Sequence, residues 1–331
     1  MRKIDKSILI IGGILLVFPF LMQCSGAKER VAIFEDVVHP DFNPSSEAKV
    51  ELGRKLFFDK RLSKDNSVSC ATCHLPEYAF TDRLEVSRGV EGRRTERNSP
   101  SILNAGYLKT VMFDAHLPTL EQQVIVPIQE HVEMDMHMLD LLKKLQEVEE
   151  YALAAKEIFD RDFDAWVLTR SIAAFERSLI SDNSNFDKFY YQKDKNAISE
   201  SAKRGWKLFS EELYCTKCHP APHFTNFKAE DNGLYAEYGE DKGRFRIHHD
   251  TADIGMFKVP SLRNIELTFP YMHDGSLKTL SEIIDHYSEG GKGHFNQSQE
   301  IVAFEIDNNQ KEDLINFLNS LTDTSYMKAY R

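Results

Sequence analysis

Cys70-Ala71-Thr72-Cys73-His74 is the stretch that decides the fold, and a second copy follows at Cys215-Thr216-Lys217-Cys218-His219. Two thiols at positions i and i+3 of one helical turn can each bond a vinyl group of the same porphyrin, and the adjacent histidine can then reach its iron. A similar phrase precedes both copies, as Gly53-Arg54-Lys55-Leu56-Phe57 and as Gly205-Trp206-Lys207-Leu208-Phe209. The repetition predicts a duplicated c-type cytochrome unit that carries two covalently attached haems.

Chain length and cysteine usage agree with this prediction. A chain of 331 residues exceeds the usual size of one domain, so each half can bury its own core. Four of the five cysteines belong to the two motifs, which excludes a disulfide framework, and zinc would need four converging thiols or imidazoles. We therefore expect a mainly α fold with two cytochrome c-like domains: a leader over residues 24–45, an N-terminal haem domain over 46–185 and a C-terminal haem domain over 186–331.

Residues 1–23 are typical of an export signal. Basic residues precede an apolar run from Ile8 to Met22, and Gln23-Cys24-Ser25-Gly26 follows it. Cys24 lies where the modified cysteine of a bacterial lipoprotein would lie, although Met22 and Gln23 differ from the small residues usual before it. Ordinary cleavage and a retained anchor are the alternatives. Because c-type haems are attached after export, we expect a periplasmic protein, with a lipid anchor on Cys24 if the lipoprotein interpretation holds.

The formal net charge of −11 bears on the class of partner. Such acidity argues against nucleic acid and is compatible with steering a basic electron-donor protein. The charge equally serves to keep an exported protein soluble.

Helical patterns surround the two motifs. Ser45 or Ser46 begins an expected helix whose apolar positions continue to Phe57. A second helix begins at Leu120, and Pro127 must end or kink it.

Further motifs accompany the attachment sites in a fixed order. Before the second site they are Phe80-Thr81-Asp82, Asn98-Ser99-Pro100-Ser101, Leu120-Glu121-Gln122-Gln123 to Pro127 and Val132-Glu133-Met134, and after it they are Val259-Pro260-Ser261-Leu262-Arg263-Asn264 and Met272-His273-Asp274-Gly275. Over about residues 48–321 the sequence resembles the bacterial di-haem cytochrome c peroxidases and their methylamine-utilisation (MauG-like) relatives. The resemblance implies reduction of hydrogen peroxide to water, with electrons from a small cytochrome or a cupredoxin that enter at the C-terminal haem.

The resemblance also implies a glutamate and a glutamine on the open face of the N-terminal haem, whose iron His74 would bind. By motif these are Gln123 and Glu133, with Gln122 and Glu130 as the nearest alternatives. A carboxylate beside hydrogen peroxide can take a proton from one oxygen and return it to the other, while an amide can hold the substrate without a change of charge. Without the flanking motifs, both residues would be interpreted as surface positions.

Members of the family that need reductive activation place a removable histidine over the peroxidatic iron. Here no histidine occurs between His74 and His116, and the loop over residues 83–97 lacks one. We therefore expect an N-terminal haem that is five-coordinate at rest and reacts with peroxide without prior reduction. His116 is expected to be structural.

Two residues compete to be the sixth ligand of the C-terminal haem, whose iron His219 would bind. Met272 adjoins the His-Asp-Gly phrase, and methionine is typical of a high-potential transfer haem. In the family, however, the ligand lies fourteen residues beyond that histidine, as Met in the peroxidases and Tyr in MauG-like members, and this position is Tyr287. We expect Tyr287, with Met272 as the alternative.

Two more expectations rest on the resemblance alone. Relatives place a tryptophan between the haems, whereas this chain has Phe113, which puts charge-sharing by hopping in doubt. Relatives also hold a calcium ion through one asparagine side chain and backbone carbonyls, and the matching residues are Asn98, Thr268 and Pro270. Dimers are common among relatives, so a homodimer is a further expectation.

Three other functions compete with the peroxidase. A MauG-like oxidase that modifies residues of a partner protein is favoured by Tyr287 and disfavoured by Phe113. A plain electron-transfer cytochrome is disfavoured by the Gln123 and Glu133 pair. A haem-based sensor has no feature of its own in the sequence.

Overall fold

The computed structural model describes residues 32–330 of the chain, so the export signal and Cys24 lie outside the described residues. Helices dominate, and the described sheet is a single antiparallel pair of two-residue strands, β1 (Ala229–Glu230) and β2 (Phe257–Lys258). The prediction of a mainly α protein is therefore confirmed. Across residues 32–330 we find no helix with the length and apolar character needed to cross a bilayer.

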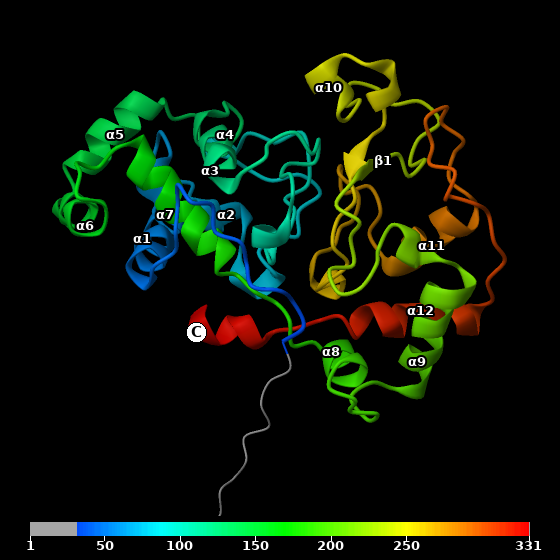
Figure 1. Cartoon of the computed structure of the whole chain (residues 1–331). Coiled ribbons are helices and arrows are strands. Elements are labelled where there is room, and N and C mark those ends of the chain that lie inside the picture. The colour runs from blue at the N-terminus through cyan, green and yellow to red at the C-terminus, as the bar shows by residue number, and fades with distance from the viewer. Residues whose placement is uncertain (1–31, 331) are drawn as a thin grey trace, which may run out of the picture. The chain divides into compact units, whose positions relative to one another are not determined.

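One group of helices builds on the first motif (Figure 1). It comprises α1 (Glu47–Phe57), α2 (Cys70–Cys73), α3 (Leu120–Gln123), α4 (Ile125–Gln129), α5 (Met138–Gln146), α6 (Glu149–Phe159) and α7 (Ala165–Arg177). Ser46 begins α1 as predicted, because its hydroxyl accepts a hydrogen bond from the Lys49 backbone N–H. The helices share an apolar core that includes the fully buried Phe57 and Phe80.

A second group builds on the second motif (Figure 1). It comprises α8 (Asn185–Tyr190), α9 (Glu200–Lys207), α10 (Phe245–His248), α11 (Leu280–Ser288) and α12 (Asn308–Asn319). A separate apolar core lies among α8, α9, α11 and α12, with Phe186, Phe224 and Phe317 fully buried. The predicted domain boundary between residues 185 and 186 falls after the first residue of α8 and stays a prediction.

The two groups repeat one helix crossing. A Cβ atom added to Gly53 of α1 would lie 1.9 Å from the Ser171 carbonyl oxygen of α7. A Cβ atom added to Gly205 of α9 would lie at the same 1.9 Å from the Asp313 carbonyl oxygen of α12. Glycine is therefore required at both positions, because only a residue without Cβ lets the backbones approach so closely. The glycine of the repeated phrase thus sets the packing in each half.

A second repeat, offset by 160 residues, joins the halves. Isolated bridges between Val111 and Leu117 and between Tyr271 and Leu277 close two matching turns. Each turn then bonds to the other half in the same way. The Asn98 N–H donates to the His273 carbonyl oxygen at 2.8 Å, and the Lys258 N–H donates to the Phe113 carbonyl oxygen at 2.7 Å. Since 98 + 160 is 258 and 113 + 160 is 273, the two bonds are reciprocal.

The terminal segments of the described chain cross between the two cores. The ring of Tyr330, near the C-terminus, lies edge-on to Phe80 with centroids 5.5 Å apart. From the N-terminal side, Phe34 stacks on His223 with centroids 4.6 Å apart, and the Arg263 guanidinium lies over the Phe34 ring at 4.6 Å from its centroid. Each core therefore receives an aromatic residue from the far end of the chain.

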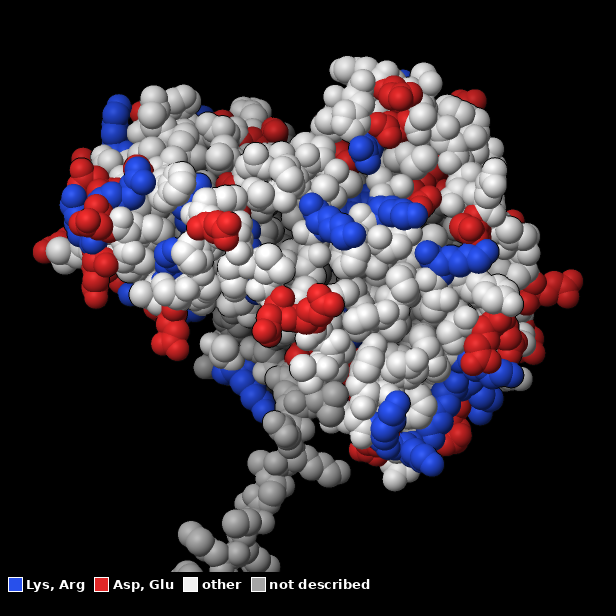
Figure 2. Space-filling model, in the orientation of Figure 1, with Lys and Arg blue, Asp and Glu red and all other residues white. Residues whose placement is uncertain are grey.

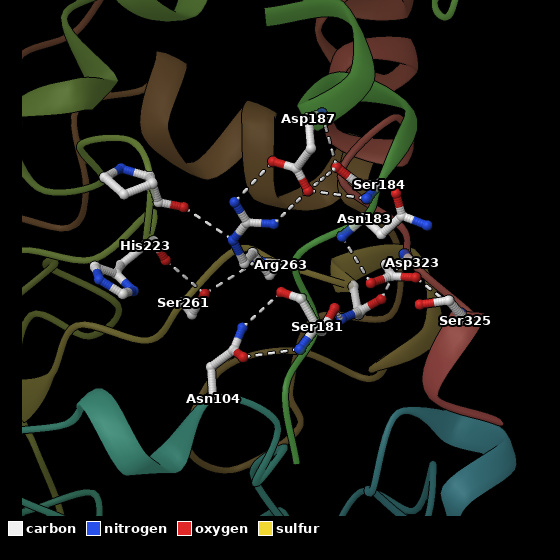
Figure 3. A network of polar contacts seen from close by, with 12 residues as sticks. Asn104, Ser181, Asn183, Ser184, Asp187, His223, Ser261, Arg263, Asp323 and Ser325 are labelled. Atoms are coloured by element: carbon white, nitrogen blue, oxygen red, sulfur yellow. Dashed lines mark hydrogen bonds and ion pairs between the residues drawn. The ribbon is translucent and has the colours of Figure 1, made fainter. Parts of the chain in front are cut away.

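Polar contacts fix the connection between the two groups of helices (Figure 3). Arg263 forms a buried bidentate pair with Asp187 at the start of α8, at 2.8 and 2.9 Å. Asn104 exchanges hydrogen bonds with the backbone of Ser181 at 2.9 Å in both directions. Two parallel hydrogen bonds give such an Arg–carboxylate pair a defined geometry. The connection is thus held in a defined path from Ser181 into α8.

Candidate functional site

Both attachment motifs adopt the local geometry that covalent haem attachment needs. Residues Cys70–Cys73 form one α-helical turn, and Cys215–Lys217 form one 3-10 turn. All four cysteines of these motifs are free thiols, and residues 32–330 contain no cluster of three or more His, Cys, Asp or Glu side chains that could bind a metal. The motifs therefore fit a porphyrin better than zinc or a disulfide.

The two motif histidines are oriented identically. Nδ1 of His74 lies 2.9 Å from the Phe80 carbonyl oxygen, and Nδ1 of His219 lies 2.9 Å from the Phe224 carbonyl oxygen. A carbonyl can only accept, so each Nδ1 carries the proton and each Nε2 keeps a free lone pair for a metal. Burial lowers the pKa of both imidazoles, that of His219 to about 4, which keeps them neutral. Both residues fit the role of axial iron ligand.

A cavity of about 340 Å³ adjoins the second motif. Its lining includes Cys215, Cys218 and His219 of the motif, together with Met272 and Tyr287. The attachment and ligand atoms of the second motif thus open on one shared space, as a haem held by that motif would require.

Glu133 lies close to the first motif. Burial is the main reason that the pKa values of the Cys70 and Cys73 thiols are raised, and the negative charge of Glu133 contributes to both shifts. The Glu133 carboxyl has no hydrogen-bond partner among the described residues, and its backbone carbonyl accepts from Val90 N–H at 2.8 Å. Burial, with a smaller contribution from Glu130, raises the pKa of Glu133 to about 7. A carboxyl of this kind can exchange a proton near neutral pH.

The structure separates the predicted residues from their nearest alternatives. Gln122 and Glu130 are exposed, and the Thr119 hydroxyl donates to the Gln122 side chain on the outer side of α3. Gln123 and Glu133 are both half-buried, and neither side chain has a hydrogen-bond partner among the described residues. Unsatisfied polar groups that are partly withdrawn from water are available to a ligand. The geometry therefore favours Gln123 and Glu133 over the alternatives.

The loop over residues 83–97 packs against the segment that carries Glu133. Arg93 on this loop donates to the His131 carbonyl oxygen at 2.7 Å and to Asp135 at 2.9 Å. The sequence motifs did not single out His131, which lies two residues before Glu133. Its side chain is 68% exposed and lies 3.2 Å from Asp135. These surface contacts hold His131 in an exposed position.

Tyr287 and Met272 meet at one side chain. The Asn232 amide nitrogen lies 3.4 Å from the Tyr287 hydroxyl oxygen and 3.4 Å from the Met272 sulfur. The Asn232 backbone carbonyl in turn accepts from His286 Nε2 at 3.0 Å, beside Tyr287 on α11. Both candidate ligands therefore line the cavity together, and a contact with Asn232 links them. In the first half, the residue 160 positions before Tyr287 is Pro127, which has no ligand atom in its side chain.

The segment between the halves contains aromatic rings around one buried cation. The Arg97 guanidinium lies 6.0 Å from the Phe113 ring centroid and 5.3 Å from that of Phe257. Phe257 stacks on His273, with centroids 3.8 Å apart and planes 14° apart. Arg97 is also paired with Asp114 at 2.8 Å. Phe113 thus occupies the junction as predicted from its motif, within a cluster that the sequence did not reveal.

The three residues matched to a calcium site border the same cavity. Asn98, Thr268 and Pro270 all contribute to its lining. The Asn98 side-chain nitrogen donates to the Leu84 carbonyl oxygen at 2.8 Å, so its side-chain oxygen remains available. An amide oxygen and backbone carbonyls are ligands that calcium accepts. The residue types and their shared location are compatible with the ion.

Sequence reasoning missed three residues near the sites. Asn232 was missed because nothing in its local sequence marks it. An alignment of the two halves would have drawn attention to Lys258 and Glu176, because each is charged where the matching residue of the other half is not. Lys258 matches Asn98 at an offset of 160, and Glu176 matches Leu318 at an offset of 142. Burial raises the pKa of Glu176 to about 8, and Glu176 contributes to the raised pKa of Cys70.

Comparison with known proteins identifies relatives over most of the chain. Residues 47–196 match the family described as di-haem cytochrome c peroxidase. The methylamine utilization protein MauG of Methylorubrum extorquens is 37% identical over 296 residues, which cover 89% of this chain and 84% of that protein. The cytochrome-c peroxidase IdrP1 of a Pseudomonas species is 31% identical, with coverages of 97% and 93%.

A solved structure supports the same assignment. The crystal structure of a MauG-like protein associated with microbial copper homeostasis superposes with a TM-score of 0.83 at 33% identity. The match covers 91% of this chain and 96% of that protein. The likeness thus spans both groups of helices.

Proposed function

The chain belongs to the di-haem cytochrome c peroxidase family and is an oxidoreductase of the peroxidase type, and from this premise we propose that it reduces hydrogen peroxide to water at the first motif. Two electrons would come from a small cytochrome or a cupredoxin and enter through the second motif. The observation that carries the proposal is the Glu133 carboxyl, whose charge contributes to the raised pKa values of the Cys70 and Cys73 thiols and whose own pKa is raised by burial to about 7.

Each motif would hold one haem c in its own domain, through Cys70, Cys73 and His74 in the first and through Cys215, Cys218 and His219 in the second. At the first site, the haem iron would exchange electrons with peroxide. Electrons would also pass from the second haem to the first. The free Nε2 lone pairs of both histidines support this assignment.

Glu133 and Gln123 would handle the substrate and its proton. In its ionised form, the Glu133 carboxylate would accept a proton from one oxygen of hydrogen peroxide and donate it to the other, which leaves as water when the O–O bond breaks. The two electrons from the donor and two protons from solvent would then convert the remaining oxygen to a second water. Gln123 donates its amide N–H to the substrate and holds it without a change of charge. A pKa near 7 matches this cycle, because the same group must accept and donate at similar free energy.

Tyr287 would close the second site. A phenolate is a hard anionic donor, so it would favour the oxidised state of the iron that His219 binds. Met272 is the alternative ligand, and the Asn232 amide contacts both. The MauG relative and this tyrosine favour a second candidate function, the oxidation of residues of a partner protein, whereas Phe113 at the junction disfavours it.

Several further assignments complete the proposal. The protein would be periplasmic, with a lipid anchor on Cys24 or ordinary cleavage before it, and it would form a homodimer. Acidic and basic side chains are interspersed on the face shown in Figure 2, so an electron donor would meet local charge pairs on this face rather than one acidic field.

A calcium ion would join the halves at Asn98, Thr268 and Pro270. Removal of divalent ions with a chelator should lower the thermal midpoint of the haem-loaded protein, and calcium should restore it while magnesium should not. An unchanged midpoint together with no bound calcium by elemental analysis would contradict this assignment.

Stopped-flow mixing of the fully oxidised protein with peroxide, with and without a reduced cytochrome, tests the proposed function. Rapid peroxide consumption coupled to cytochrome oxidation supports the peroxidase. A long-lived oxidised species with poor cytochrome turnover supports the protein-oxidising alternative. No reaction would leave only an electron-transfer cytochrome.

A further inference from the structure

Three Lys or Arg side chains line the cavity beside the second motif. Lys217 is ion-paired with Glu300, and Arg263 is paired with Asp187 at 2.8 Å. Lys258 differs from both, because its side chain has no ion pair or hydrogen bond with any of residues 32–330. Within the described chain it is the cation of this cavity that lacks a partner.

The backbone of Lys258 is fixed on two sides. Across the β1–β2 pair it lies opposite Ala229, and its own N–H donates to the Phe113 carbonyl oxygen at 2.7 Å. The next residue, Val259, donates its N–H to the Lys228 carbonyl oxygen at 2.8 Å. The Cα atom of Lys258 is therefore held in place at the junction of the halves, from which the side chain lines the cavity.

The surroundings of Lys258 disfavour an uncompensated charge. Burial alone lowers the pKa of Lys258 to about 8, and no carboxylate of the described residues offsets that shift. Glu230 also lines the cavity, but in the sheet it lies opposite Phe257 rather than opposite Lys258, and no ion pair joins it to Lys258. Lys258 is half-buried, and a cation that is partly withdrawn from water without a counter-ion is destabilised, so the cavity is suited to an anion at this point.

We propose that Lys258 forms an ion pair with a carboxylate of the haem attached at Cys215 and Cys218, and that this pair raises the reduction potential of that haem. The inference rests on the proposed function, since it needs a haem in this cavity. Haem carries carboxylates as its anionic groups, and a positive charge beside them opposes the extra positive charge of oxidised iron.

The pair would act on one haem only. The residue that matches Lys258 in the first half is Asn98, which bonds reciprocally across the junction but carries no charge. The asymmetry therefore shifts the potential of the second haem relative to the first, and it would offset part of the lowering expected from a phenolate ligand.

The test is a spectroelectrochemical titration of the haem-loaded protein and of Lys258→Met. We expect the midpoint potential of the second haem to fall by the equivalent of about a tenfold change in the reduction equilibrium, which is about 59 mV for a one-electron couple. Lys258→Arg should change the equilibrium less than about twofold. Lys228→Met, which removes an exposed cation nearby, is the matched control and should also change it less than about twofold.

The outcomes separate this inference from the function on which it rests. The inference would be overturned if the midpoint potential of the second haem were unchanged in Lys258→Met. It would also be overturned if the axial-ligand spectrum changed in this variant in a way that showed Lys258 to be an iron ligand in the wild-type protein. Loss of the second haem from Lys258→Met but not from Lys258→Arg would support it, and loss from both would overturn it. A wild-type chain without two haems would instead refute the proposed function.

Discussion

The two attachment regions are alike on the side of the motif histidines and unlike on the opposite side. His74 and His219 donate to backbone carbonyls at the same 2.9 Å, and Gly53 and Gly205 allow the same helix crossing. Tyr287 and Met272 line the same cavity as His219, whereas the match to Tyr287 in the first half is Pro127. The two halves thus share one way to orient the motif histidine, and under the proposed function the residues that differ would give the two sites different chemistry.

The same asymmetry extends to the charges around the two sites. The first half has a buried Glu176 where the second has the buried Leu318, and it has a neutral Asn98 where the second has Lys258. At these matched positions the first half therefore has a buried carboxyl group, and the second has a lysine without a described partner. This division suits a reactive site and an electron-transfer site respectively.

Replacement of Glu133 should have the largest effect on the difference between the two halves. Glu133→Gln should lower the rate of peroxide reduction by about 10²–10⁴-fold, because the proton acceptor is lost while the shape is kept. Stopped-flow rates measure the effect, and the haem content should stay at two per chain. Glu130→Gln, at an exposed neighbour, should leave the rate unchanged, and equal losses in both variants would refute the assignment.

The shared scaffold predicts equal effects in the two halves. Gly53→Ala and Gly205→Ala each force a Cβ against a carbonyl oxygen, so each should lower the free energy of unfolding by about 1–3 kcal/mol or more. Thermal or denaturant unfolding of the haem-loaded protein measures this. Gly239→Ala, where a Cβ meets nothing within 4 Å, is the control and should be nearly neutral. A large difference between the first two variants would contradict a repeated crossing.

Glu176 should make the stability of the first half depend on pH. Its pKa is raised from the ordinary value to about 8 in the folded state by burial, so the unfolded chain releases this proton first as pH rises. Stability is therefore lost between about pH 4.5 and pH 8. Glu176→Gln should raise the free energy of unfolding by about 4 kcal/mol at pH 8, and should leave it nearly unchanged at pH 4. A gain of equal size at both pH values would contradict the prediction.

The smallest expected effect is the pH profile of the wild-type rate. Because Glu133 accepts a proton only when ionised, peroxide reduction should rise with pH and reach half its maximum near pH 7. The residual rate of Glu133→Gln should lack this inflection. An inflection that persists in the variant would assign the titration to another group.

The sequence predicted the features that local motifs encode. The helix over 47–57, the mainly α class and the family follow from the apolar spacing and the repeated CxxCH phrase. The motif order also placed Tyr287 and Met272, which line one cavity in the structure. The reciprocal bonds of Asn98 and Lys258, and the contact of Asn232 with both candidate ligands, depend on tertiary packing between distant segments. No local pattern encodes such contacts, which is why the sequence did not predict the bonds across the junction or the contact of Asn232.

The spin states of the two irons in the fully oxidised, haem-loaded protein test most directly whether the two haems have different sixth-ligand positions. Electron paramagnetic resonance at low temperature should detect one high-spin and one low-spin haem in equal amounts, and Tyr287→Phe should alter only the low-spin signal. Met272→Ala is the paired variant, and a low-spin change confined to it would assign the ligand to Met272. Two low-spin haems in the wild-type protein would contradict an open site at His74.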